Sequence, residues 1–207
     1  RFVGELSALH TSVRGGDLRE DAKDILVASL GAVFSRDEKN KGFKIDYIYK
    51  ADPDYPNEKS PLDDPYLDVR VGDIISKVNG KDTLSAIDMG ELIRNESRNQ
   101  VRITLLRGTS FRDIIVKPIA SEYNLRYRDW EYSNRLDVEE KSENQIGYIH
   151  LRAMGSNDIN QFYREFYPVF NKAGLIVDVR YNFGGNIDSF ILEKLLRKAW
   201  MYWKARS

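Results

Sequence analysis

The sequence predicts a mixed α+β protein in which a β-rich module is flanked by a helical N-terminal segment and by a βαβ unit. Residues 32–120 contain several short runs of β-branched and aliphatic residues separated by turn signals. Residues 145–196 instead alternate strand-like runs with stretches of helical spacing. A chain of 207 residues is long enough to form one large domain or two small ones with real cores.

Composition and charge exclude several classes of protein and site. The chain has 32 basic and 32 acidic residues and no basic block, so we expect no nucleic-acid partner and no anionic membrane surface as a partner. No apolar run approaches the roughly 20 residues that span a bilayer, so membrane insertion is not expected. The absence of cysteine excludes disulfides, thiol catalysis and thiolate metal sites.

The first 31 residues have helical spacing in two pieces, separated by Gly15 and Gly16, and Asp17 can cap the second piece. His10 lies in the first piece. A histidine titrates near neutral pH and is therefore a natural general base. A lone histidine beside apolar residues is also a common structural hydrogen-bonding group. Position alone leaves both roles open for His10.

The β-rich module is predicted from five strand-like runs, at residues 32–34, 44–49, 74–78, 101–106 and 113–116. Asn79-Gly80 is a hairpin turn signal. We expect a helix over residues 85–94 and a polar, proline-bearing loop over residues 51–65. The module therefore reads as a self-contained small β fold.

The second half begins with residues 122–144, a charged and aromatic stretch that we expect to be an extended connector between the modules. Strand-like patterns follow at residues 145–151 and 174–180, and helical patterns at residues 156–170 and 187–196. This order predicts a right-handed βαβ unit with a parallel strand pair. Ligand loops in such sheets lie at the carboxyl ends of the strands.

The Gly184-Gly185 pair follows the second of these strands and precedes a helix. Adjacent glycines let backbone N–H groups approach a ligand closely, and the next helix N-terminus adds partial positive charge. The turn is therefore a candidate site for an anion or a developing oxyanion. The alternative is a tight connection in an α/β layer with no chemical role.

Within the β-rich module, residues 69–81 read Val-Arg-Val-Gly-Asp-Ile-Ile-Ser-Lys-Val-Asn-Gly-Lys. This phrase resembles the Gly-Asp-x-Ile-x-x-Val-Asn-Gly signature of PDZ domains, and Ser60-Pro61 precedes it as in many family members. The resemblance implies that a peptide adds as a strand to an exposed sheet edge. Gly42 and Phe43 resemble the loop and strand that hold the peptide. A scaffolding module is the alternative.

A wider resemblance covers nearly all 207 residues. Gly-Tyr-Ile-His-Leu at residues 147–151, then Gly-Leu-Ile-Val-Asp-Val-Arg-x-Asn-x-Gly-Gly at residues 174–185, with a PDZ-like module upstream, resemble the tail-specific serine peptidases and more narrowly the tricorn-like branch. The implied organisation is a helical cap over residues 1–31, a PDZ-like domain over 32–120, and a connector with a partial α/β core over 121–207.

The resemblance also implies roles for single residues. It makes His10 the general base and the backbone N–H of Gly184, or alternatively Gly185, an oxyanion donor. The family's nucleophilic serine lies in a segment of the type Thr-Ala-Ser-Asp-Gly, which we expect after Ser207. Ser189 falls inside the last helical pattern and is assigned a packing or capping role.

The function expected on these grounds is peptide-bond hydrolysis through an acyl-enzyme by the full-length protein, with no cofactor and no metal. We expect the chain to be a fragment that lacks this activity. Its expected partner is a peptide or unfolded protein, and the resemblance suggests a homo-oligomer. A cytoplasmic and an exported location both stay open.

Two other hypotheses stay open beside the peptidase. One is a non-catalytic peptide-binding or scaffolding protein, which Leu9 favours because tricorn has a serine directly before the base histidine. The other is an anion-binding α/β domain that rests on the glycine turn alone.

Overall fold

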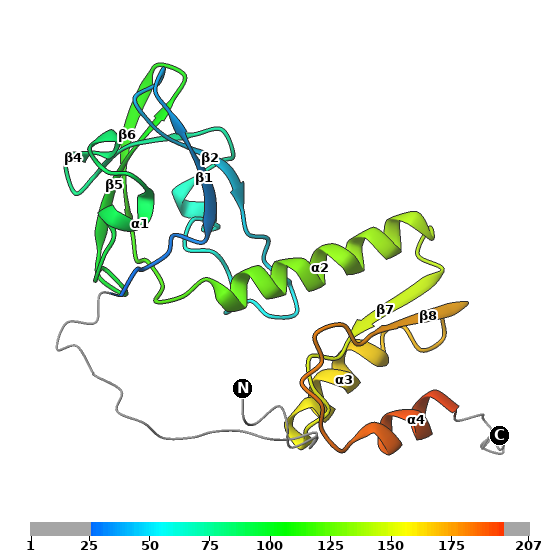
Figure 1. Cartoon of the computed structure of the whole chain (residues 1–207). Coiled ribbons are helices and arrows are strands. Elements are labelled where there is room, and N and C mark those ends of the chain that lie inside the picture. Colours follow the sequence, from blue (N-terminus) through cyan, green and yellow to red (C-terminus); the bar gives the residue numbers. More distant parts are fainter. Residues whose placement is uncertain (1–25, 197–207) are drawn as a thin grey trace, which may run out of the picture.

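The computed structural model of the protein describes residues 26–196, which form two units joined by a long helix (Figure 1). Residues 1–25, with the predicted helical pieces and His10, lie outside the described residues, as do residues 197–207. The first unit is an antiparallel sheet, and the second pairs parallel strands with helices. The predicted mixed fold class is therefore confirmed.

The first unit is a sheet with the strand order β1-β2-β3-β5-β6, and β4 pairs with β3. All of its strand pairs are antiparallel. Its elements are β1 (Ala32–Asp37), β2 (Gly42–Ile48), β3 (Ile74–Val78), β4 (Lys81–Asp82), α1 (Met89–Leu92), β5 (Val101–Arg107) and β6 (Ser110–Val116).

The predicted Asn-Gly turn connects β3 to β4. Asn79 and Gly80 both have positive φ, 50° and 83°, which is the conformation that favours this residue pair in hairpins. The core beneath the sheet contains residues from every large strand, among them Phe43, Ile45, Ile75, Val78, Val101, Ile103, Leu105, Ile114 and Val116. The apolar runs of the sequence therefore mark the buried faces of these strands.

Residues 26–31, which helical spacing assigned to the N-terminal cap, are extended and belong to the first unit. Ser29 and Ile119 exchange two backbone hydrogen bonds of 2.8 and 2.9 Å, and Val27 forms a bridge with Arg94. Leu30 is buried in the core of this unit. The helical prediction was wrong here because backbone pairing and burial outweigh a weak local periodicity.

The helix α2 (Tyr123–Lys141) replaces the extended connector that we expected. That prediction was wrong because the buried face of the helix carries charge instead of an apolar stripe. Arg128 and Glu131 are only 5% and 6% exposed, and they pair at 3.0 Å. Reading hydrophobic periodicity cannot find a helix of this kind.

The second unit contains β7 (Ile146–His150), α3 (Ile159–Phe166), β8 (Gly174–Asp178) and α4 (Asp188–Leu196). β7 and β8 pair in parallel, from Ile146 opposite Gly174 to His150 opposite Asp178. A second core holds them to the helices through Ile149, Leu151, Phe162, Phe166, Val169, Ile187 and Ile191. The helical pattern over residues 156–170 predicted a longer helix than α3, which ends at Phe166, and Phe170 is exposed.

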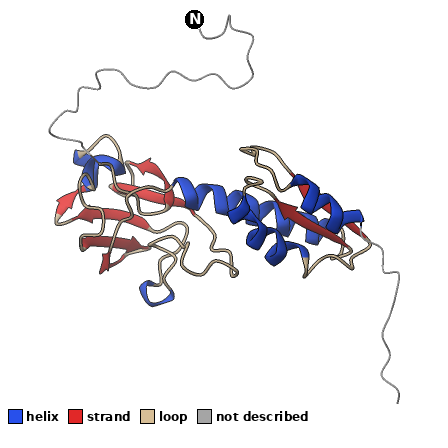
Figure 2. Ribbon diagram, turned by 90° about the horizontal axis from the view of Figure 1, so that it is seen from below, coloured by secondary structure: helices blue, strands red, loops and turns tan. Residues whose placement is uncertain are grey.

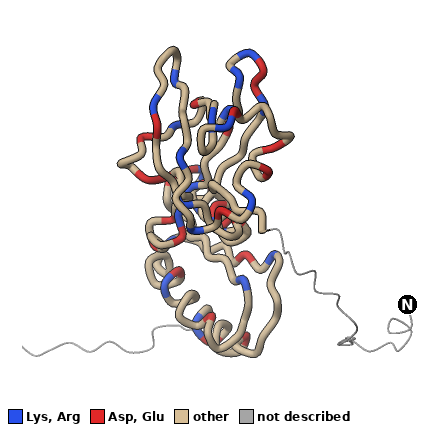
Figure 3. The backbone as a smooth tube through the Cα atoms, turned by 90° about the vertical axis from the view of Figure 1, so that its left-hand side faces the viewer, with Lys and Arg blue, Asp and Glu red and all other residues tan. Residues whose placement is uncertain are grey.

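α2 runs between the two units, and the sheet of the first unit lies at one of its ends (Figure 2). Acidic and basic residues are interspersed along the described backbone, with both signs present in each unit (Figure 3). Among residues 26–196, no helix combines the length and the apolar character needed to cross a bilayer.

Candidate active site

The glycine turn connects β8 with α4 and is hydrogen-bonded to the segment that follows β7. The N–H of Phe183 donates to the carbonyl of Arg152 at 2.9 Å, and the N–H of Met154 donates to the carbonyl of Gly184 at 2.8 Å. The turn therefore lies beyond the carboxyl ends of both parallel strands, where ligand loops of α/β sheets are found.

Both glycines of the turn have conformations that other residues rarely adopt. Gly184 has a φ of 81° and open space where a Cβ would stand. Gly185 has a φ of 147°, and a Cβ there would lie 2.0 Å from the carbonyl atoms of Met154. Only glycine fits at position 185, because the backbone of Met154 occupies the place of any side chain.

The two backbone N–H groups of this pair differ in their availability. The N–H of Gly184 donates to the Asn182 side-chain oxygen at 2.7 Å, while the Asn182 amide nitrogen donates to the Leu151 carbonyl at 2.7 Å. The N–H of Gly185 has no hydrogen-bond partner within residues 26–196, and Gly185 is exposed. Of the two predicted oxyanion donors, the structure leaves the Gly185 N–H available to a ligand.

Ser189 and His10 are two further residues that the sequence singled out. Ser189 is exposed in the first turn of α4, one residue after its start. His10 lies outside the described residues, so its predicted approach to the turn stays a prediction.

His150, which the sequence suggested only as part of a strand, is buried at the end of β7, against α2. Its Nδ1 lies 2.9 Å from the Asp178 carbonyl, so Nδ1 carries the proton, and its Nε2 accepts from the Tyr127 hydroxyl at 2.9 Å. Burial lowers the pKa of His150 and keeps the ring neutral. Both ring nitrogens are occupied, so His150 has a structural role and is not the base.

A chain of contacts from the end of β8 supports the turn. The Arg180 guanidinium bonds the Asp178 carboxylate at 2.9 Å and lowers the pKa of Asp178. The same guanidinium lies 4.8 Å from the ring centre of Trp130 on α2, and Trp130 meets the ring of Tyr181 edge-on at 5.6 Å. The helix that the sequence failed to predict is therefore one wall of the site.

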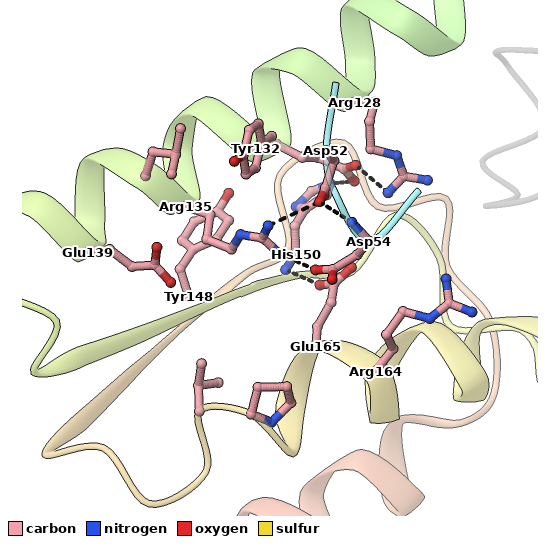
Figure 4. Close-up of a pocket in the computed structure, with 14 residues that line it drawn as sticks. Asp52, Asp54, Arg128, Tyr132, Arg135, Glu139, Tyr148, His150, Arg164 and Glu165 are labelled. Carbon is pink, nitrogen blue, oxygen red and sulfur yellow. Dashed lines mark hydrogen bonds and ion pairs between the residues drawn. The ribbon is translucent and has the colours of Figure 1, made fainter. Parts of the chain in front are cut away.

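A polar cavity of about 280 Å³ lies on the other side of His150, between α2, α3 and the loop after β2 (Figure 4). Arg135 of α2 reaches Asp52 and Asp54 at 3.0 and 2.8 Å. Arg128 bonds both Glu58 at 3.0 Å and Glu131, which also holds Arg152 at 2.6 Å. This network ties the first unit to α2 and α2 to the second unit.

Glu165 of α3 also faces this cavity (Figure 4). Its carboxylate accepts from the His150 backbone N–H at 3.0 Å, and burial raises the pKa of Glu165. In the part of the chain that the structure describes, no three His, Asp or Glu side chains are grouped so that they could hold a metal ion. The ion pairs around the cavity connect the two units through α2.

A second candidate site is a groove of about 370 Å³ between the edge strand β1 and α1. Phe34 of β1, Met89 and Ile93 line its walls, and residues 27–30 and Ser121-Glu122 line the rest. An exposed edge strand beside a helix is the place where peptides add to such a sheet.

Gly42 and Phe43, predicted to hold the peptide, do not line this groove. Phe43 is 4% exposed and belongs to the core, and a Cβ on Gly42 would lie 2.5 Å from the Ile75 carbonyl oxygen. The structure places both on β2, which pairs with β1 on one side and with β3 on the other.

The loop that does lie at the end of the groove contains Gly31, whose φ is 71° and whose Cβ would meet Ser60 at 2.6 Å. The phrase Ser29-Leu30-Gly31-Ala32 precedes the strand β1 and was missed. The signal that could have located the groove was a glycine directly before an apolar strand. In the structure this glycine contacts the Ser60-Pro61 pair.

Comparison with known proteins agrees with both halves of this description. Residues 28–121 match the family model of the tricorn protease PDZ domain, and residues 145–204 match the model of peptidase family S41. The chain aligns with a crystal structure of the tricorn protease at a TM-score of 0.73 and 30% identity, over 87% of this chain and 17% of that one.

Curated relatives point to the same branch. The chain is 38% identical over 183 residues to a putative tricorn-like protease C-terminal subunit of Sulfurisphaera tokodaii, covering 88% of this chain and 21% of the relative. It is also 38% identical over 195 residues to a tricorn protease homolog of Saccharolobus solfataricus, covering 94% and 18%. The chain thus spans about a fifth of the length of these relatives. It belongs to the tricorn-like peptidases of family S41.

Proposed function

We propose that the full-length protein is a serine endopeptidase and that the glycine turn is the oxyanion side of its active site. The observation that carries the proposal concerns Gly185, an exposed residue whose backbone is in close contact with Met154 and whose N–H has no partner within residues 26–196. A preorganised donor of this kind stabilises the charge that develops on the carbonyl oxygen of a scissile peptide.

In this proposal His10 is the general base. It takes the proton of a nucleophilic serine as the serine attacks the peptide carbonyl, and it returns the proton to the leaving amine. The serine comes from outside the 207 residues, because no Thr-Ala-Ser-Asp-Gly segment occurs within them. The division into an N-terminal cap, a PDZ-like domain and a connector with a partial core is part of the proposal, with the first limit moved from residue 31 to residue 25 because residues 26–31 pair with the first unit. Assembly of the full-length protein into a homo-oligomer is also part of the proposal.

We also propose that the groove between β1 and α1 binds the peptide substrate as an added strand. Its support is the unpaired edge of β1 and the apolar lining that the groove receives from both sides. This extends the peptidase proposal to substrate binding, and a scaffolding role for the module is the alternative that a lack of peptide binding would favour.

The test of the proposed activity is peptide hydrolysis by the full-length protein and its His10→Ala variant. We expect His10→Ala to lower kcat/KM by at least about a thousandfold, since removal of the base disables the nucleophile. The folded state should be unchanged by circular dichroism. A variant that keeps its activity would remove His10 from the mechanism, and an inactive wild-type protein would favour the non-catalytic alternative.

A further inference from the structure

We propose that an aromatic pocket on α2 is a peptide subsite that links the groove to the glycine turn. The subsite would take a neutral aromatic side chain of the peptide that lies in the groove, so the inference rests on the proposed peptide-binding function. In three dimensions α2 runs from the sheet unit, which contains β1, to the unit that contains β7 and β8, so it lies between segments that are far apart in sequence (Figure 1).

The pocket has a volume of about 570 Å³ and is built from one face of α2 and from the glycine turn. Tyr123, Tyr127 and Trp130 follow one another at spacings of four and three residues, with ring centres 6.3 and 5.6 Å apart. Tyr181 closes the far end against Trp130. Tyr123 is 62% and Tyr181 is 70% exposed, so each ring keeps a large part of its apolar surface open to a ligand.

The pocket adjoins the groove, because Ser121 and Glu122 line both. The eight helical steps from Glu122 to Trp130 span about 12 Å along the helix. An extended peptide covers this distance with roughly four residues. A peptide that adds to β1 and continues past Glu122 therefore reaches Tyr181, at the start of the glycine turn.

The end of the groove favours a chain that continues over one that stops there. The N–H of Gly31, in the loop at this end, donates to the Ser29 hydroxyl at 2.9 Å. The Ser29 hydroxyl in turn donates to the Glu122 carboxylate at 2.6 Å. A terminal carboxylate would meet the like charge of Glu122, whereas an internal peptide segment brings no charge of its own.

The charges around the pocket indicate a neutral aromatic occupant. The Arg180 guanidinium already lies 4.8 Å from the Trp130 ring centre, and Arg126 stands at the rim. Both guanidinium groups already have carboxylate partners, Arg180 in Asp178 and Arg126 in Glu122, so the described residues of the lining have no unpaired charge that would attract a charged side chain of the peptide. A phenylalanine would pack against Tyr123 and Tyr181 in edge or offset arrangements.

The test measures binding of two capped, dye-labelled peptides to the 207-residue chain by fluorescence anisotropy. Both peptides contain a Val-Thr-Val-Thr segment that can add as a strand. Four residues beyond each end of this segment, one peptide carries Phe and the other carries Ala. We expect the Phe peptide to bind about tenfold more tightly, the effect of one aromatic contact. Tyr123→Ala should bring the ratio of the two affinities close to one.

Two controls separate the subsite from the groove. Tyr66→Ala removes a tyrosine that is 97% exposed and outside the pocket, and it should keep the tenfold ratio. Val27→Glu places a charge at the groove and should weaken both peptides while the ratio is kept. Val27 is 55% exposed, so this variant should fold.

Equal affinity of the two peptides for the wild-type chain would overturn the subsite and leave peptide binding at the groove in place. Absence of binding by both peptides would overturn the groove and the subsite together. The affinity ratio of the two peptides could also be near one for the wild-type chain and rise to tenfold when residues 1–25 are removed. That result would mean that residues 1–25 occupy the pocket, and it would contradict the proposal.

Discussion

Asn182 fixes the glycine turn through both atoms of its side-chain amide. One atom accepts from the Gly184 N–H and the other donates to the Leu151 carbonyl, so the residue joins the turn to the end of the neighbouring strand. Gly185 is exposed and in close contact with the Met154 backbone, and its N–H has no partner among the described residues 26–196. At the scale of residues, the turn is preorganised by hydrogen bonds that involve no charged group.

We predict that Asn182→Ala lowers kcat of the full-length enzyme by about 10- to 100-fold, because a displaced turn loses part of its oxyanion stabilisation. KM should change little, since the substitution lies outside the groove. The measurement is steady-state kinetics with a peptide substrate. Asn99→Ala, on an exposed loop of the first unit, is the matched control and should behave like wild type. An unchanged kcat in Asn182→Ala would argue against the turn as the oxyanion site.

His150 allows a prediction about pH. Its folded-state pKa is lowered by burial, so the unfolded chain binds more protons once the pH falls below about 6.5. The stability that His150 contributes is therefore present above pH 6.5 and is lost on acidification, by up to about 1.4 kcal/mol per pH unit. Urea unfolding at pH 7.5 and 5.5 measures this loss.

The variant His150→Asn is the comparison for this measurement, because asparagine can still donate to the Asp178 carbonyl but does not titrate. We expect the variant to be less stable at pH 7.5 and to lose less of its stability at pH 5.5. The buried Glu165 acts in the opposite direction in both proteins, since its raised pKa favours the folded state as pH falls. The same pH dependence in both proteins would mean that His150 is not the responsible group.

At the scale of elements, α2 decides how the site is built. Its N-cap residue Glu122 lines the groove, and Trp130 in its middle contacts Tyr181 of the glycine turn. Its buried charged residues hold the loop after β2 and the segment after β7. Glu131 is central to this arrangement because it accepts from Arg128 and from Arg152. A buried carboxylate between two arginines is costly to remove.

We predict that Glu131→Gln destabilises the chain by about 3 to 5 kcal/mol, because two arginines lose the negative charge that they share. The measurement is the urea unfolding of the 207-residue chain. Glu140→Gln, at an exposed position of the same helix, is the control and should change the stability by less than about 0.5 kcal/mol. A small effect of Glu131→Gln would show that the ion pairs do not hold α2 in place.

The sequence could predict the elements whose buried faces are apolar and could not predict those held by charge or by distant backbone pairing. The run at residues 74–78 coincides with β3, and both strands of the βαβ unit appear where their apolar runs lie. α2 was missed because Arg128 and Glu131 are on its buried face. Residues 26–31 were misassigned because their partner, Ile119, is far away in the chain.

The same distinction holds for the sites. The glycine turn was visible in sequence because two adjacent glycines between a strand and a helix form a local pattern. Peptide binding was assigned to Gly42 and Phe43 because a short sequence motif was matched without knowledge of the neighbouring strands. Only the strand order shows that β1 is an edge strand and that β2 is not. The aromatic pocket could not be predicted, since it combines a helix that was not expected with Tyr181 of the turn.

At the scale of the whole molecule, two cores are joined through α2 and its ion pairs. The first core lies within the sheet unit and the second between β7, β8 and the helices that cover them. We predict that residues 26–121 expressed alone unfold in a single cooperative transition, because their core and backbone pairing are self-contained. Thermal melts followed by near- and far-UV circular dichroism should coincide, and a non-cooperative melt would contradict this division.

The central claim is that this chain carries the oxyanion side of a serine peptidase whose nucleophile lies outside it. Labelling with a fluorophosphonate probe, followed by mass spectrometry of the modified peptide, tests this claim most directly. We predict that the full-length protein is modified at a single serine beyond residue 207, and that the 207-residue chain is not modified at all. Modification of Ser189, or of any other serine within the 207 residues, would contradict the claim, as would a full-length protein that the probe leaves unmodified.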